Sequence, residues 1–62
     1  MIYMKANGKF VSVIGYDHVD FTDSKLDAFD LDKMPSEEDQ KLYRSWIKTA
    51  DPTVPDVEFV NE

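Results

Sequence analysis

The chain contains no cysteine among its 62 residues, and it has only two glycines, one histidine and one tryptophan. Without cysteine it can form no disulfide, offer no thiolate to a metal and provide no cysteine nucleophile. Two glycines are too few for a glycine-rich loop that cradles phosphates. No apolar run approaches the ~18–20 residues of a membrane span, and the N-terminus lacks the basic and apolar regions of a signal peptide. We therefore expect a cytoplasmic protein without a membrane segment.

Positive charge is also scarce, because 13 acidic residues outnumber 7 basic ones and give a net charge of −6. The charge is segregated along the chain. Residues 1–16 contain two lysines and no acid, and residues 17–39 contain nine acids and two lysines. The charged residues of 40–50 are all basic, and those of 51–62 are all acidic. Proteins that bind the nucleic-acid backbone normally carry an excess of lysine and arginine. We therefore expect no direct nucleic-acid ligand.

A chain of this length predicts a single small domain over residues 1–62, whose core supplies only ~3–5 kcal/mol. Asn7-Gly8 lies between two apolar runs and predicts a two-residue type I′ hairpin turn, since both residues tolerate positive φ. The turn sets a register in which alternate residues share a face. The expected core face holds Ile2, Met4, Ala6, Val11 and Val13. The other face, with Tyr3, Lys5, Phe10 and Ser12, is expected to be half exposed and to offer aromatic area for an interface.

A third short strand is predicted over residues 18–22, where apolar and polar residues alternate. From Asp23 the spacing fits a short helix or a loop equally well, with Leu26 and Phe29 on its inner side. Pro35 ends this region.

The clearest helix begins after Ser36, a natural N-cap, and ends before Asp51-Pro52. Its first turn is acidic, as the helix dipole favours. The apolar side is expected to face the sheet and consists of Leu42, Tyr43, Trp46, Ile47 and Ala50, with Trp46 in the core. Lys41, Arg44 and Lys48 are predicted to form a solvated face, with Lys41 paired to Glu37.

Residues 51–62 are predicted to form an extended C-terminal arm or an edge strand, with Val57 and Phe59 on its buried side. The fold class is therefore α+β: a small antiparallel hairpin or three-stranded sheet packed against one main helix.

No constellation of residues predicts catalysis. His18 follows Asp17, and a carboxylate–imidazole pair can support a general base or a metal, but a second partner and a pocket are missing. The aspartates do not match a calcium loop, because Asp30 and Asp32 are followed by Met34 and no glycine occurs after Gly15. We predict no catalytic residue, no metal and no cofactor, and treat His18 as a surface turn residue.

The acidic block is the most informative feature for function. Its carboxylates recur every three or four residues between apolar residues that anchor them, and such a row can present phosphate-like charge to a basic groove. The predicted partner-binding residues are Asp17, Asp20, Asp23, Asp27, Asp30, Asp32, Glu37, Glu38, Tyr3 and Phe10. The hypothesis is a non-catalytic protein that inhibits or modulates a larger partner, with a nucleic-acid-binding enzyme as the favoured target class. By association alone, this make-up is typical of phage and mobile-element accessory proteins.

Two other interpretations stay open. The carboxylates also serve simply to keep a tiny domain soluble. Alternatively, the chain is a structural or assembly subunit that adds strands to its neighbours through the hairpin edge and the C-terminal arm, Val57–Val60. The sequence leaves the oligomeric state open.

Overall fold

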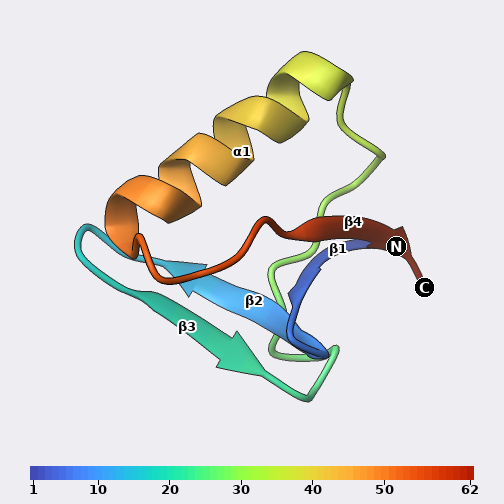
Figure 1. Ribbon diagram of the computed structural model, residues 1–62. Coiled ribbons are helices and arrows are strands. Elements are labelled where there is room, and N and C mark those ends of the chain that lie inside the picture. The colour runs from blue at the N-terminus through green and yellow to red at the C-terminus, as the bar shows by residue number, and fades with distance from the viewer.

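The computed structural model describes all residues, 1–62, as a four-stranded antiparallel sheet with one helix (Figure 1). The elements are β1 (Ile2–Ala6), β2 (Lys9–Ile14), β3 (Val19–Thr22), α1 (Glu37–Ala50) and β4 (Glu58–Asn61). The strand order is β3-β2-β1-β4, so the hairpin of β1 and β2 is the centre of the sheet. The predicted small α+β fold is confirmed. The fourth strand, β4, is the edge strand predicted as one alternative for residues 51–62, and it pairs with β1.

The predicted hairpin turn is also confirmed. Asn7 has a φ of 54° and Gly8 a φ of 77°, as a type I′ turn requires. The expected register is present next to the turn, where Ala6 is opposite Lys9 and Lys5 is opposite Phe10. The turn chemistry is therefore sufficient to start the sheet.

The sequence predicted that this register continues to the far end of the hairpin, and this prediction is wrong. Ile2 instead exchanges backbone hydrogen bonds with Leu31, at 2.9 and 3.3 Å, and the N–H of Phe29 donates to the carbonyl of Val11 at 2.9 Å. The segment 29–31 thus enters between the ends of β1 and β2 and holds them apart. The β2–β3 register also shifts between Val11 and Val13, as in a β-bulge, so Val13 is opposite Asp20 and is exposed, while Ile14 packs against the core in its place.

The core lies on one face of the sheet, beneath the end of the helix and the segment that follows it. Its buried members are Met4, Ala6, Val11, Ile47, Val54 and Val57. Three of them come from the central strands, as the alternation of β1 and β2 predicts, and two come from the chain between α1 and β4. Figure 1 shows this returning segment passing beneath the helix toward β4.

The bounds of the helix agree with its sequence signals. The Ser36 side chain accepts a hydrogen bond from the Asp39 N–H at 3.2 Å, and the helix ends at Asp51, whose extended backbone leads into Pro52. The capping residue and the proline therefore set both ends locally.

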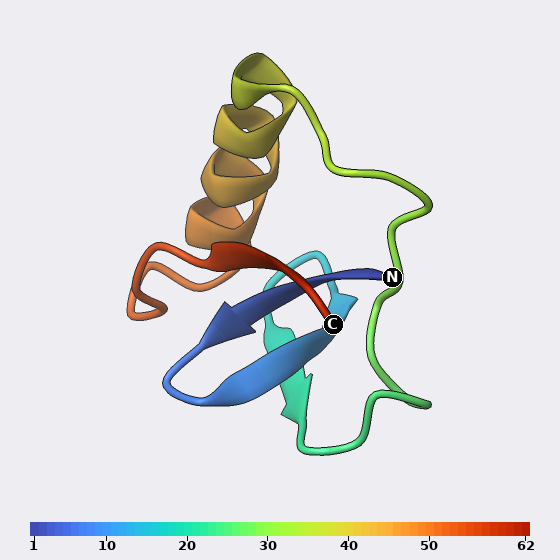
Figure 2. The ribbon, with the colours of Figure 1, turned by 90° about the vertical axis from the view of Figure 1, so that its right-hand side faces the viewer.

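The burial of the helix differs from the prediction. Trp46 is 48% exposed and Leu42 is 67% exposed, whereas Ile47 and Ala50 are the two buried residues. Figure 2 shows the reason: α1 meets the sheet with its C-terminal end, and its N-terminal half rises away from the strands. A sheet this small covers only part of the apolar arc, so the prediction that Trp46 lies in the core is wrong.

The region after β3 forms a loop rather than a short helix. Only one turn forms, with hydrogen bonds from the Asp27 N–H to Ser24 and from the Ala28 N–H to Lys25. Leu26, expected on the inner side, is 97% exposed. A longer helix is excluded here because the next residues must extend to enter between β1 and β2.

The second face of the sheet is more covered than expected. Tyr3 is 4% exposed and Phe10 is 6% exposed, with their ring centroids 5.2 Å apart. The Lys5 ammonium lies over the Phe10 ring, and Lys5 and Lys25 both form ion pairs with Glu62, at 3.3 and 3.2 Å. Lys25 belongs to the loop after β3, so that loop and the chain end close over this face. The expectation that Tyr3 and Phe10 are half-exposed contact residues is therefore wrong.

The contrast between neighbouring helix residues predicts unequal effects of mutation. Ile47→Val removes one buried methyl group and is expected to lower the free energy of unfolding by ~0.5–1.5 kcal/mol. Leu42→Ala removes more atoms from an exposed position and is expected to change it by less than ~0.5 kcal/mol. Urea denaturation followed by circular dichroism measures both, and a larger loss for Leu42→Ala would contradict the packing described here.

The turn gives a second prediction. Gly8→Ala places a side chain at a φ of 77°, where open space surrounds the new methyl group, so the cost is backbone strain alone. We expect a loss of ~1–2 kcal/mol in unfolding free energy. Asn7→Gly is the matched control and should be nearly neutral, because glycine adopts the same φ freely. Equal stability of Gly8→Ala and the parent protein in urea would show that the turn is of another type.

Candidate functional site

The acidic residues predicted as a partner surface are all exposed. Most of them lie on the path from the end of β3 to the first turn of α1, which we call the acidic margin. It consists of Asp23, Asp27, Asp30, Asp32, Glu37, Glu38 and Asp39. Figure 2 shows this path running along one side of the molecule, from below the sheet to the start of the helix. The structure thus places these seven carboxylates along one edge of the fold.

Asp17 and Asp20 lie apart from the acidic margin. Asp17 belongs to the turn between β2 and β3, which Figure 1 places beside the C-terminal end of the helix, at the other end of β3 from Asp23. Their carboxylates flank His18 instead, at 3.1 Å from Asp17 and 3.9 Å from Asp20. The single row predicted over residues 17–39 is therefore divided into two groups.

The acidic margin has no lysine or arginine partner. Lys25 lies within the block in sequence, but its ammonium forms an ion pair with Glu62. Lys48 approaches Asp56, and the predicted pair between Glu37 and Lys41 is not formed. Lys33, between Asp32 and Glu37, forms no ion pair, and with seven acids against Lys25 and Lys33 the stretch 23–39 keeps a net charge of −5. Charges of one sign gathered in this way produce a field that attracts a basic partner over a long range.

A second candidate surface lies on the exposed half of α1. The sequence predicted that its apolar residues are buried against the sheet. Asp39, Leu42, Tyr43 and Trp46 line a shallow depression of about 370 Å³, which we call the Trp46 depression. The rings of Tyr43 and Trp46 are stacked, with centroids 6.3 Å apart and planes 27° apart. The sequence could have indicated this surface, because the apolar side of α1 is longer than three or four short strands can cover.

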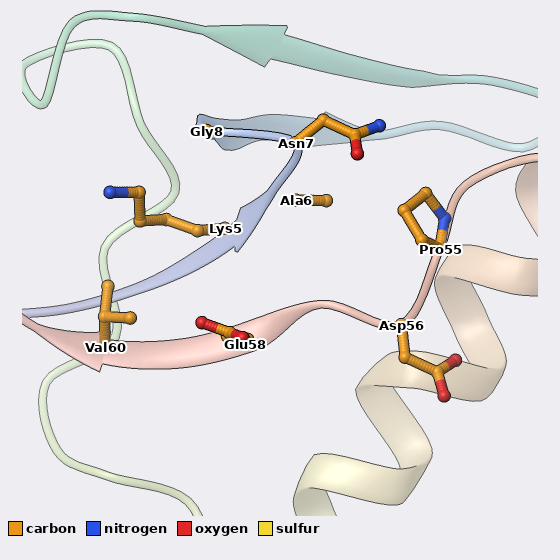
Figure 3. Close-up of a pocket in the computed structure, with 8 residues that line it drawn as sticks. All are labelled: Lys5, Ala6, Asn7, Gly8, Pro55, Asp56, Glu58 and Val60. Atoms are coloured by element: carbon orange, nitrogen blue, oxygen red, sulfur yellow. The ribbon is translucent and has the colours of Figure 1, made fainter.

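A third hollow, of about 400 Å³, lies between the hairpin turn and the segment before β4 (Figure 3). Its charged residues are Lys5, Asp56 and Glu58, and its lining contains no histidine, serine or cysteine. In Figure 3 the Lys5 and Asp56 side chains point away from one another. This open and polar hollow presents no nucleophile beside a general base.

The group around His18 is the one place where titratable side chains meet. Its ring rests against Gly15, so closely that a Cβ there would overlap it, and the Gly15 N–H donates to the His18 carbonyl at 2.8 Å. The hydrogen bond that the His18 ring donates to the Asp17 carboxylate, and the charge of Asp20, raise the pKa of His18 above its usual 6.5. All three side chains are more than half exposed, and no group of three or more histidine or carboxylate ligands is arranged to hold a metal.

Comparisons with known proteins give no relative. No protein-family model, no curated protein and no solved structure matches this chain. The helix is not long and apolar enough to cross a lipid bilayer. The candidate surfaces are therefore judged by their own geometry.

The histidine group predicts a specific pH dependence. Because the pKa of His18 is raised in the folded state, protonation contributes stability that is fully present below its unfolded value of 6.5 and is lost as the pH rises through the folded pKa. NMR titration of the His18 ring should give a pKa above 6.5, and Asp17→Asn should lower it. Asp32→Asn, in the acidic margin, is the control. A His18 pKa at or below 6.5 in the parent protein would contradict the contact with Asp17.

Proposed function

We propose that this protein is a cytoplasmic, non-catalytic protein-binding domain that inhibits or modulates a larger partner through its acidic margin. The partner surface is basic, and the favoured class is a groove that otherwise holds nucleic acid. The observation that carries the proposal is the set of exposed carboxylates from Asp23 to Asp39 without a lysine or arginine partner.

The way the margin is held supports this proposal over a flexible acidic tail. Leu31 is half buried and bonded to β1, while its neighbours Asp30 and Asp32 are exposed. In an extended segment, alternate residues point to the same side, so these two carboxylates project together away from the sheet. Phe29 is bonded to β2 and packs edge-on against Tyr43, which holds the residues before Asp30 in place. A partner therefore meets carboxylates whose positions are already set, and less conformational entropy is lost on binding.

The charges further along the helix do not cancel the margin. Glu37, Glu38 and Asp39 occupy the first turn, Lys41 follows Glu37 by one turn on the same side without forming an ion pair, and Lys48 lies in the last turn of α1. The first turn thus continues the negative surface from the loop onto the helix. A basic groove of a partner would meet a surface that is negative on balance, with Lys33 as the one base between Asp32 and Glu37, and attraction at long range would speed its encounter.

The free outer edge of β4 favours assembly by strand addition as a second candidate. The hairpin itself offers no edge, because β1 and β2 are both interior strands. Arg44 Nε donates to the carbonyl of Val57 at 3.2 Å, so the backbone acceptor just before β4 is already used within the chain. The acidic margin carries the stronger proposal.

A displacement experiment tests the proposed function. Proteins from a lysate of the source cells are bound to DNA-cellulose, and the purified domain is added at micromolar concentration. The parent protein should release a defined set of DNA-binding proteins, identified by mass spectrometry. The fourfold variant Asp23→Asn, Asp27→Asn, Asp30→Asn, Asp32→Asn should not release them. Raising the salt from 50 to 200 mM should weaken direct binding of the released proteins to the immobilised domain several-fold, because exposed charges are screened.

The matched control removes the same number of negative charges elsewhere, as Asp17→Asn, Asp20→Asn, Asp56→Asn, Glu58→Gln. It should release the same proteins as the parent chain, and circular dichroism should show that both variants fold. Release by the margin variant at the parent's concentration would overturn the proposal. Equal loss in both variants would also overturn it, since the effect would then depend on total charge and not on the margin.

A further inference from the structure

The Trp46 depression joins an apolar platform to one carboxylate of the acidic margin. Trp46 and Leu42 expose apolar surface on the half of α1 that the sheet does not cover, and Asp39 places its carboxylate on the lining of the same depression. The Asp39 carboxylate has no hydrogen-bond or ion-pair partner, because only its backbone N–H is used, by the Ser36 cap. An aromatic platform beside a free carboxylate is a site for a cation that also has an apolar stem.

Among protein side chains, arginine fits this combination best. Its planar guanidinium stacks on aromatic rings and pairs with a carboxylate through two N–H groups, whereas a lysine ammonium is a strongly hydrated point charge. Trp46 is half exposed on the lining of the depression, where it is stacked on its neighbour Tyr43, so its indole is open to a guanidinium. This fold already makes the same type of contact internally, where the Arg44 guanidinium lies 5.3 Å from the centre of the Phe59 ring.

A second copy of this chain is a poor occupant for the depression. In a twofold contact the same patch lies on both partners, so the Trp46 depressions of two copies would bring both Asp39 carboxylates and both acidic first turns together. Each chain also carries a net charge of −6, which opposes association. Charge complementarity therefore selects a basic partner of another sequence.

We infer that the Trp46 depression binds an arginine side chain of the partner protein, with the guanidinium stacked on Trp46 and bonded to Asp39. The inference rests on the proposed function, because it supplies the specific anchor for a partner that the acidic margin attracts. Leu42 packs against the aliphatic stem or an adjacent apolar residue of the partner. The margin then governs the rate of encounter, and the depression governs the lifetime of the complex.

The test needs no partner, because Trp46 is the single tryptophan and its indole N–H is a unique NMR reporter. The labelled protein is titrated with Nα-acetyl-arginine N-methylamide, and with the corresponding lysine and citrulline compounds. We expect saturable shifts of the Trp46 indole and of the Asp39–Trp46 amides with the arginine compound. The lysine compound should bind several-fold more weakly, and the uncharged citrulline compound should give no saturable shift.

Variants separate the depression from general charge attraction. Asp39→Asn should weaken arginine binding about 3- to 5-fold, as for an exposed ion pair, while the helix is retained because the Ser36 cap uses the Asp39 backbone N–H. Asp32→Asn removes a charge of the margin outside the depression and should change binding by less than twofold. No localised shift with the arginine compound, equal shifts with citrulline, or equal weakening by both variants would overturn the inference.

The displacement assay provides the second measurement and keeps the two proposals distinguishable. Trp46→Ala should weaken release from DNA-cellulose by ~10- to 100-fold, as for an aromatic anchor in an interface, and Leu26→Ala should have no effect. Full activity of Trp46→Ala would overturn the anchor even if the margin variant is inactive. Conversely, arginine binding by the depression together with an active margin variant would overturn the proposed function and leave the arginine site standing.

Discussion

The backbone hydrogen bonds of Phe29 and Leu31 with β2 and β1 are the contacts on which the rest of this fold depends. They hold the long connection between β3 and α1 against the centre of the sheet. Without these hydrogen bonds, the connection would be a free loop, and the start of α1 would have no fixed position relative to the sheet. The same bonds keep the ends of β1 and β2 apart and set Asp30 and Asp32 on the outer side. One local insertion thus shapes both the sheet and the acidic margin.

The small size of the sheet is the second constraint. Four short strands bury the last turns of α1, through Ile47 and Ala50, and leave the apolar residues nearer its start in solvent. In a larger domain another layer would cover Leu42 and Trp46. Here their exposure places an aromatic pair next to the acidic first turn, where the helix dipole already favours negative charge. The limited core and the candidate binding surface therefore have the same physical origin.

Two lysines, Lys5 and Lys25, affect how charge is distributed over the surface. Lys5 and Lys25 are drawn to Glu62, where they lie over the second face of the sheet beside the buried ring of Phe10. Neither ammonium forms an ion pair with a carboxylate of the acidic margin. Exposed ion pairs of this kind contribute little to stability, typically ~0–1 kcal/mol. Their larger consequence is the charge pattern, which leaves one side of the molecule strongly negative.

The sequence by itself determined what depends on neighbouring residues: the Asn7-Gly8 turn, the Ser36 cap, the proline stop after Asp51 and the α+β class. Each rests on backbone conformations or hydrogen bonds within a few positions of the chain. Only the tertiary structure decided that residues 29–31 separate the hairpin, that Tyr3 and Phe10 are covered, and that Trp46 remains exposed. Periodicity identifies which residues of a helix or strand are apolar, but the area of the surface that faces them decides how many are buried. That area is set by contacts between segments far apart in the chain, which no local pattern contains.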